Sequence, residues 1–116
     1  MIRLSSEDRV LAAVKEMLKT HDKCVGLRIT STIGMPDLIA CVNGRFVGIE
    51  VKYDKDGSYG MTKAQRIRLR QIIKAGGIGC CVDKNNLQSF KKLLDLLCED
   101  ATISVKCWGY TDPGLE

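Results

Sequence analysis

The sequence predicts an α/β fold in which a mixed central sheet is flanked by helices. Helical and extended patterns alternate along the 116 residues in the order α-β-β-β-α-β-α, with a possible final β. Two neighbouring extended segments are apolar on nearly every residue, which is typical of strands covered on both faces. An Asn43-Gly44 step joins them, which favours a two-residue hairpin. The length fits a single domain, which we expect over residues 1–110, followed by a flexible tail at 111–116.

Three helices are expected from periodicity and capping. The first covers about residues 6–20, where apolar side chains recur at helical spacing and Glu7 lies in the first turn, which suits the helix dipole. The second opens at Thr62-Lys63-Ala64-Gln65, a capping-box pattern, and ends at Gly76-Gly77. Asn85 or Asn86 is expected to cap the third. Its apolar face consists of Leu87, Phe90, Leu93, Leu94 and Leu97.

The expected strands are short runs rich in apolar and β-branched residues. They cover residues 24–30, 37–42, 45–52 and 78–82, with a last one at 102–108.

Composition restricts the class of protein. The net charge of +4, from 18 basic and 14 acidic residues, is compatible with a polyanionic partner but does not require one. No apolar run has the length of a membrane span and the first residues do not resemble a signal peptide, so we expect a cytosolic protein and no membrane partner. Six cysteines without a C-x-x-C pair, and His21 as the single histidine, argue against structural zinc. We expect buried free thiols in a reducing compartment.

The hairpin brings two acids together. With a two-residue turn, opposed residues have numbers that sum to 87, so Asp37 falls opposite Glu50. Their Cβ atoms would lie about 5 Å apart on one face of the sheet. Lys52 is two residues beyond Glu50 and therefore joins the same face.

Two opposed carboxylates in an apolar sheet are destabilising unless something compensates for them. The alternatives are a shared proton, Lys52 alone, or a divalent cation, for which carboxylate oxygens are suitable ligands. A simple surface ion pair is the plainest alternative for any one of these residues. The cation uses Asp37, Glu50 and Lys52 together, so the set predicts a metal centre.

These residues resemble a known signature. Pro36-Asp37 followed by Glu50-Val51-Lys52 is similar to the PD-(D/E)XK nuclease motif. With Gly34 before the Pro-Asp pair, and Thr62-Lys63-Ala64-Gln65 after the motif, the chain resembles the virus-type replication-repair nuclease (VRR-NUC) branch over roughly residues 7–98. The resemblance implies a restriction-endonuclease-like fold.

The resemblance also implies an activity and a site. Members hydrolyse DNA phosphodiesters with Mg²⁺, for which Mn²⁺ substitutes, and stand-alone members resemble Holliday-junction resolvases and tend to be homodimers. Such a protein would work in the cytoplasm of a phage host or bacterium. The implied metal ligands are Glu7, Asp37, Glu50 and the carbonyl of Val51, and the implied catalytic residues are Asp37, Glu50, Lys52 and Gln65.

Several candidates have a second explanation. Gln65 is either a helix cap, a site residue or both, and Glu7 is favoured in a first helical turn by the dipole alone. Ser31 is placed to bind a phosphate, although loop serines more often bond to local backbone. The second helix carries candidate DNA contacts that a solvated helix face would also explain; they are Lys63, Arg66 and Arg70.

The function expected from these residues is a metal-dependent, structure-selective DNA endonuclease that acts at four-way junctions. The alternatives are a nuclease for flaps, single strands or other DNA, and a non-catalytic DNA-binding module on a nuclease fold.

Overall fold

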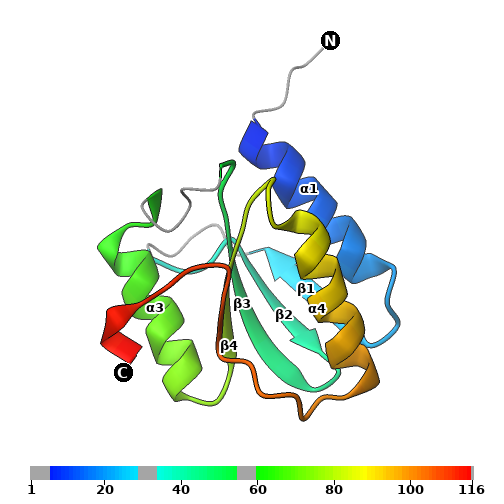
Figure 1. The fold of residues 1–116 in the computed structure, drawn as a ribbon. Helices are drawn as coiled ribbons and strands as arrows, with labels where there is room; N and C mark the ends of the chain where they lie inside the picture. The colour runs from blue at the N-terminus through cyan, green and yellow to red at the C-terminus, as the bar shows by residue number, and fades with distance from the viewer. Residues whose placement is uncertain (1–5, 29–33, 55–59, 116) are drawn as a thin grey trace.

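The computed structural model describes residues 6–28, 34–54 and 60–115. Their elements follow the predicted order, with a mixed sheet between helices (Figure 1). The helices are α1 (Ser6–Lys19), α3 (Lys63–Lys74), α4 (Leu87–Glu99) and the short 3₁₀ helix η1 (Pro113–Leu115). The strands are β1 (Cys24–Arg28), β2 (Leu38–Val42), β3 (Arg45–Val51), β4 (Ile78–Val82) and β5 (Cys107–Trp108).

The sheet has the spatial order β1-β2-β3-β4-β5. β1, β2 and β3 pair antiparallel, whereas β4 is parallel to β3 and β5 is parallel to β4. A parallel pair needs a crossover, and α3 provides it between β3 and β4. The helices α1 and α4 lie on one side of the sheet and α3 on the other (Figure 1).

The β2–β3 hairpin has the predicted register. Asn43 and Gly44 have φ angles of 48° and 85°, the left-handed conformations that a type I′ turn requires. Val42 pairs with Arg45 and Leu38 pairs with Ile49, so each pair sums to 87. The sequence-based register is therefore confirmed.

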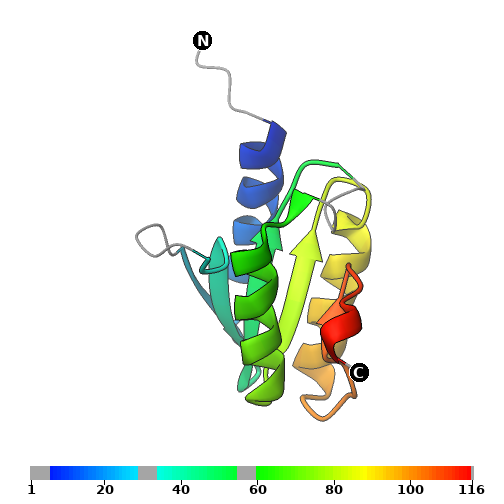
Figure 2. The same ribbon diagram turned by 90° about the vertical axis from the view of Figure 1, so that its left-hand side faces the viewer.

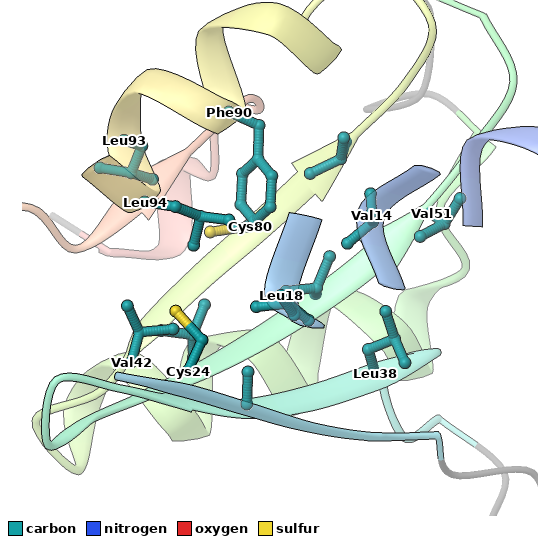
Figure 3. Packing of buried hydrophobic residues seen from close by; sticks show 14 of the residues in the cluster. Val14, Leu18, Cys24, Leu38, Val42, Val51, Cys80, Phe90, Leu93 and Leu94 are labelled. Atoms are coloured by element: carbon teal, nitrogen blue, oxygen red, sulfur yellow. The ribbon is translucent and has the colours of Figure 1, made fainter. Parts of the chain in front are cut away.

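The main core lies between the sheet and the α1–α4 layer. Val14 and Leu18 of α1, Phe90 and Leu94 of α4, and the inward residues of the strands, such as Leu38, are buried there (Figure 3). These side chains recur at helical spacing on the helices and at every second position on β2, so amphipathic periodicity alone directs them inward.

The opposite face is covered only in part. Leu69 and Ile73 of α3 are buried, and β3 is buried from Val47 to Val51. The prediction that both faces are covered is correct for β3 but wrong for β2, where Cys41 is exposed. Figure 2 shows α3, in green, lying across one part of the sheet, while the cyan strands extend beyond it. One helix is too narrow to cover five strands.

The ends of α3 match their sequence signals. Thr62 and Gln65 form a complete capping box. At the other end Gly76 has a φ of 100°, and the amides of Gly76 and Gly77 donate to the carbonyls of Ile73 and Ile72, which is a Schellman ending.

The start of α4 differs from the prediction. Asn86 occupies the N-cap position, but its side chain makes no capping hydrogen bond. Its Oδ1 instead accepts from the Asp83 amide at 2.8 Å, and its Nδ2 donates to the Cys81 carbonyl at 3.1 Å. The asparagine therefore closes the loop after β4.

The last strand is shorter than predicted. The sequence predicts it at 102–108, whereas β5 contains only residues 107–108. The segment before β5 supplies hydrogen-bond acceptors for the guanidinium of Arg45. The guanidinium donates to the carbonyls of Ala101, Ile103 and Val105 at 2.8, 3.0 and 3.2 Å. The carbonyls of Ala101, Ile103 and Val105 thus bond to the Arg45 side chain and not to a neighbouring strand.

The C-terminal segment contacts α3, although residues 111–116 are expected to be a flexible tail. Asp112 accepts from Arg70 through both carboxylate oxygens at 2.9 Å, and Arg66 donates to the Thr111 carbonyl at 3.2 Å. Described residues 111–115 are therefore held on the helix by two arginines.

The six cysteines are free thiols. Cys24, Cys80 and Cys81 are buried, as expected, whereas Cys41 is exposed on the uncovered face of β2. Within the described ranges, no helix has the length and apolar character needed to cross a membrane.

Candidate active site

Three of the predicted site residues, Asp37, Glu50 and Lys52, lie at one end of the β2–β3 hairpin. Asp37 immediately precedes β2, Glu50 is the penultimate residue of β3 and Lys52 directly follows β3. Because Leu38 pairs with Ile49, continuing the register by one residue places Asp37 opposite Glu50. The hairpin thus brings together two acids that are 13 positions apart in the sequence.

Asp37 is anchored to the neighbouring strand. Its Oδ2 accepts a hydrogen bond from the Val51 amide at 2.8 Å. The contact depends on a close approach between layers, since a Cβ at Gly48 would lie 2.7 Å from Ile72 Cδ1 and 3.3 Å from Pro36 Cγ. The glycine therefore lets α3 and the Pro-Asp segment pack directly on β3.

Glu50 is the most deeply buried acid of the described chain, with 1% of its surface exposed. Its Oε1 accepts from the Gln65 side-chain amide at 3.0 Å. Its Oε2 is buried and has no hydrogen-bond donor among the described residues. A buried carboxylate oxygen without a donor is costly, so this atom needs either a proton or a cation.

Burial, together with a hydrogen bond and charge repulsion from Asp37, raises the pKa of Glu50 to about 9. Two carboxylates share a hydrogen bond only when one carries a proton. Without a cation, the pair therefore keeps a proton at neutral pH. The positive charge of Lys52 lowers this pKa but does not offset the other effects.

Lys52 lies beside the carboxylate pair. Its Nζ is 3.9 Å from Glu50 Oε1 and 3.5 Å from Gln65 Oε1. The side chain is 18% exposed, so the ammonium is within reach of an incoming ligand. Among the described residues, it is the one cation that forms an ion pair with Glu50.

Gln65 caps the helix and also contacts the predicted site residue Glu50. Its Oε1 accepts from the Thr62 amide at 2.8 Å and closes the capping box. Its Nε2 donates to Glu50 at the same time. The start of α3 and the position of the buried carboxylate are therefore linked through a single amide.

The remaining predicted metal ligands, Glu7 and the Val51 carbonyl, have no direct contact with the carboxylate pair among the described residues. Glu7 is exposed in the first turn of α1, but its negative charge contributes to the raised pKa of Glu50, so it lies within electrostatic range. No contact among the described residues joins it to either carboxylate. Val51 contributes its amide to Asp37. The metal-binding role of its carbonyl stays a prediction.

The predicted nucleic-acid contacts are only partly available. Lys63 is exposed at the start of α3. Arg66 and Arg70 bond to the C-terminal segment instead, and the hydrogen bonds from Arg70 hold the pKa of Asp112 below its usual value. Ser31 lies outside the described residues.

Two residues beside the site are not among those predicted from the sequence. Cys81 pairs in register with Glu50 across β3 and β4, and burial raises the pKa of this thiol to about 12. Asp83 is 4% exposed, and its Oδ1 accepts from the Asn85 and Asn86 amides. The signal for Asp83 was present, because an acid directly follows the apolar run of β4.

The donor set fits a hard divalent cation in part. Asp37 and Glu50 supply carboxylate oxygens, one of which lacks a donor. Within the described ranges, no group of three or more His, Cys, Asp or Glu side chains is arranged around a common point. A complete coordination shell therefore needs backbone carbonyl, water or substrate oxygens in addition.

Comparison with known proteins gave no relative: no protein-family model, curated protein or solved structure matches this chain. The likeness to PD-(D/E)XK nucleases therefore depends on the motif residues themselves. Any function assigned to the chain has to follow from the geometry around Asp37 and Glu50.

Proposed function

We propose that this chain is a Mg²⁺-dependent DNA endonuclease that hydrolyses phosphodiester bonds at branched, four-way junctions. The observation that carries the proposal is the buried Glu50 carboxylate, which faces Asp37 and has one oxygen without a donor. Such an arrangement is unfavourable for a purely structural pair, because replacement by apolar residues would remove the cost of burial. A divalent cation would convert that cost into binding energy.

Asp37 and Glu50 are the residues that would hold Mg²⁺ or Mn²⁺, with the Val51 carbonyl and Glu7 as further candidates. When bound, the ion lowers the pKa of a coordinated water and shields negative charge on the phosphate. The amide of Val51 keeps one oxygen of Asp37 in place. Gln65 does the same for Glu50. Both carboxylates are therefore oriented before a substrate arrives, which favours catalysis.

Lys52 has the position of a phosphate contact. Its ammonium is close to Glu50 yet partly exposed. A phosphodiester that approached the carboxylate pair would meet this cation first. Lys52 would then offset the charge that develops on the phosphate oxygens during attack by water.

A junction has two strands to cut, and the described chain has one such carboxylate pair. We therefore propose that two copies of the chain act together as a symmetric homodimer. The preference for junctions over flaps or single strands rests on the resemblance, so each of these DNA forms belongs in the test.

The test is cleavage of a labelled four-way junction, a flap, a single strand and a linear duplex in Mg²⁺, Mn²⁺ or EDTA. We expect metal-dependent cleavage of the junction. Asp37→Asn and Lys52→Ala should each lower the rate by about 10²-fold or more. Glu16→Gln and Lys106→Ala change the same charges at exposed positions away from the site and should leave the rate unchanged.

Absence of cleavage of any substrate with either metal would contradict the proposal, as would equal rates for the site variants and the parent. Metal-independent DNA binding without cleavage would instead favour a non-catalytic DNA-binding module.

A further inference from the structure

A surface groove separates α1 from the edge strand β1. One hollow of about 250 Å³ is lined by residues of both elements, and an adjoining hollow of about 370 Å³ continues along α1. Lys15 and Arg28 line both hollows. The two therefore form one groove along this side of the molecule, on the face of the sheet that α1 covers.

The floor of the groove is apolar. Leu18, Gly26 and Leu38 line it, and α1 packs closely here because Gly26 has no side chain: a Cβ would lie 2.7 Å from Leu18 Cδ1. Val25, at the rim, is 65% exposed. β1 is the last strand on this side of the sheet, so within the described residues no further strand borders the groove.

The walls of the groove are basic. Lys15 and Lys19 are exposed one turn apart on α1, which corresponds to about 5–6 Å between their Cβ atoms. Arg28 extends from β1 on the other side. None of the three side chains forms an ion pair or hydrogen bond with another described residue. A single carboxylate, that of Asp8, lines the second hollow.

The groove reaches the same end of the sheet as the candidate active site, but on the opposite face. Val47, Ile49 and Val51 pack in the α1–α4 core, whereas Glu50 contacts Gln65 of α3. Arg28 pairs in register with Leu38, the residue that follows Asp37. The N-terminal end of α1 carries Glu7, whose charge is felt by Glu50. The cations thus begin at the end of the sheet where the two carboxylates lie and continue away from it along α1.

We propose that this groove binds the phosphodiester backbone of a nucleic acid strand beside the cleavage point, with Lys15, Lys19 and Arg28 as phosphate contacts. Apolar side chains on the floor suit the sugar rings, and three cations suit successive phosphates. An acidic peptide would meet the same charges, but it would have no reason to lie next to a metal-binding carboxylate pair. The inference rests on the proposed nuclease function.

The experiment measures binding of a labelled four-way junction and a labelled single strand by fluorescence anisotropy in EDTA, between 50 and 200 mM salt. The variant Lys15→Gln/Lys19→Gln/Arg28→Gln removes the groove cations. The matched control Lys91→Gln/Lys92→Gln/Lys106→Gln removes the same charge from exposed positions elsewhere. Thermal melts check that both variants are folded.

We expect the groove variant to bind at least about tenfold more weakly at 50 mM salt. The slope of log K against log salt should fall by about 2–3, since each phosphate contact contributes about 0.7–0.9. The control should match the parent. In a second measurement on the unmodified protein, bound DNA should protect Lys15 and Lys19 from acetylation more than Lys91 and Lys92.

Parent-like binding and slope in the groove variant would overturn the proposal, as would equal acetylation of all four lysines. Displacement of DNA by poly-glutamate at equal charge concentration would favour an acidic peptide and also overturn it. Failure of the enzyme proposal is separate: the parent would then cut no DNA, while the groove variant would still lose binding. If the groove variant bound and cut DNA like the parent, only the groove proposal would be contradicted, and the proposed nuclease function would stand.

Discussion

At the scale of single residues, Glu50 is where stability and the proposed function conflict. Its carboxyl group is 1% exposed, has one oxygen without a donor and has a pKa raised to about 9. At pH values above the pKa of this group in the unfolded chain, it destabilises the metal-free fold. Between the ordinary pKa of 4.5 and about 9, the unfolded chain releases a proton that the folded chain retains. The free energy of unfolding therefore falls as pH rises through this window.

We expect Glu50→Gln to stabilise the metal-free protein at pH 8, by about 1–3 kcal/mol. A glutamine keeps the shape, accepts from Gln65 and carries no charge. At pH 4 or below the gain should nearly vanish, because the parent side chain is then protonated in the folded state and largely so in the unfolded chain. Urea unfolding in EDTA at both pH values measures the difference. Glu16→Gln, at an exposed position, is the control.

The opposite effect should appear with metal. Mg²⁺ should raise the stability of the parent and not that of Glu50→Gln, since a ligand that binds only the folded state stabilises it by mass action. If the free energy of unfolding of Glu50→Gln depended on pH in the same way as that of the parent, the description of Glu50 as a protonated, buried acid would be contradicted.

At the scale of elements, the start of α3 combines a helix cap with a contact to the proposed site. The capping box of Thr62 and Gln65 begins the helix, and the same glutamine amide contacts Glu50. Helix α3 is also the crossover between β3 and β4, so its N-terminus lies by necessity at the end of the sheet where β3 ends. The topology thus explains why a cap residue reaches the site.

Two substitutions separate these roles. Thr62→Ala removes the cap and should cost about 0.5–2 kcal/mol of stability, with the rate constant of cleavage retained. Gln65→Glu keeps an acceptor for the Thr62 amide, but it removes the donor to Glu50 and adds a negative charge. We expect it to lower cleavage by at least about tenfold. Urea unfolding and junction cleavage measure both variants. Equal loss of activity in the two would assign Gln65 a purely capping role.

At the scale of the whole molecule, the uneven cover of the sheet is the main feature. Helices α1 and α4 cover one face, whereas α3 leaves the outer strands of the other face open (Figure 2). Val25 and Leu27 of β1 and Phe46 of β3 are 65%, 62% and 48% exposed. Exposed apolar side chains of this kind favour association.

We expect the protein to sediment as a dimer at micromolar concentration, because the described residues supply one carboxylate pair per chain and a junction requires two cuts. Sedimentation velocity over a concentration series, with and without Mg²⁺, measures the mass of the species. A monomer throughout this range would contradict the homodimer, but it would leave metal-dependent cleavage open to a direct test.

The sequence by itself determined the hairpin and the order of the elements. Asn43-Gly44 selects a two-residue turn whose backbone twist suits the strands, and this local geometry sets the opposition of Asp37 and Glu50. The capping box at Thr62 was also readable, because capping depends on residues within one turn.

Only the tertiary structure decided which residues of distant segments bond to one another. Arg45 bonds to three carbonyls after α4, and the strand predicted at 102–108 covers only 107–108. Arg70, a predicted DNA contact, bonds to Asp112. The burial of Glu50, its contact with Gln65 and the groove between α1 and β1 likewise require several elements to be in place. Contacts of this kind depend on packing over the whole chain, and no local pattern specifies them.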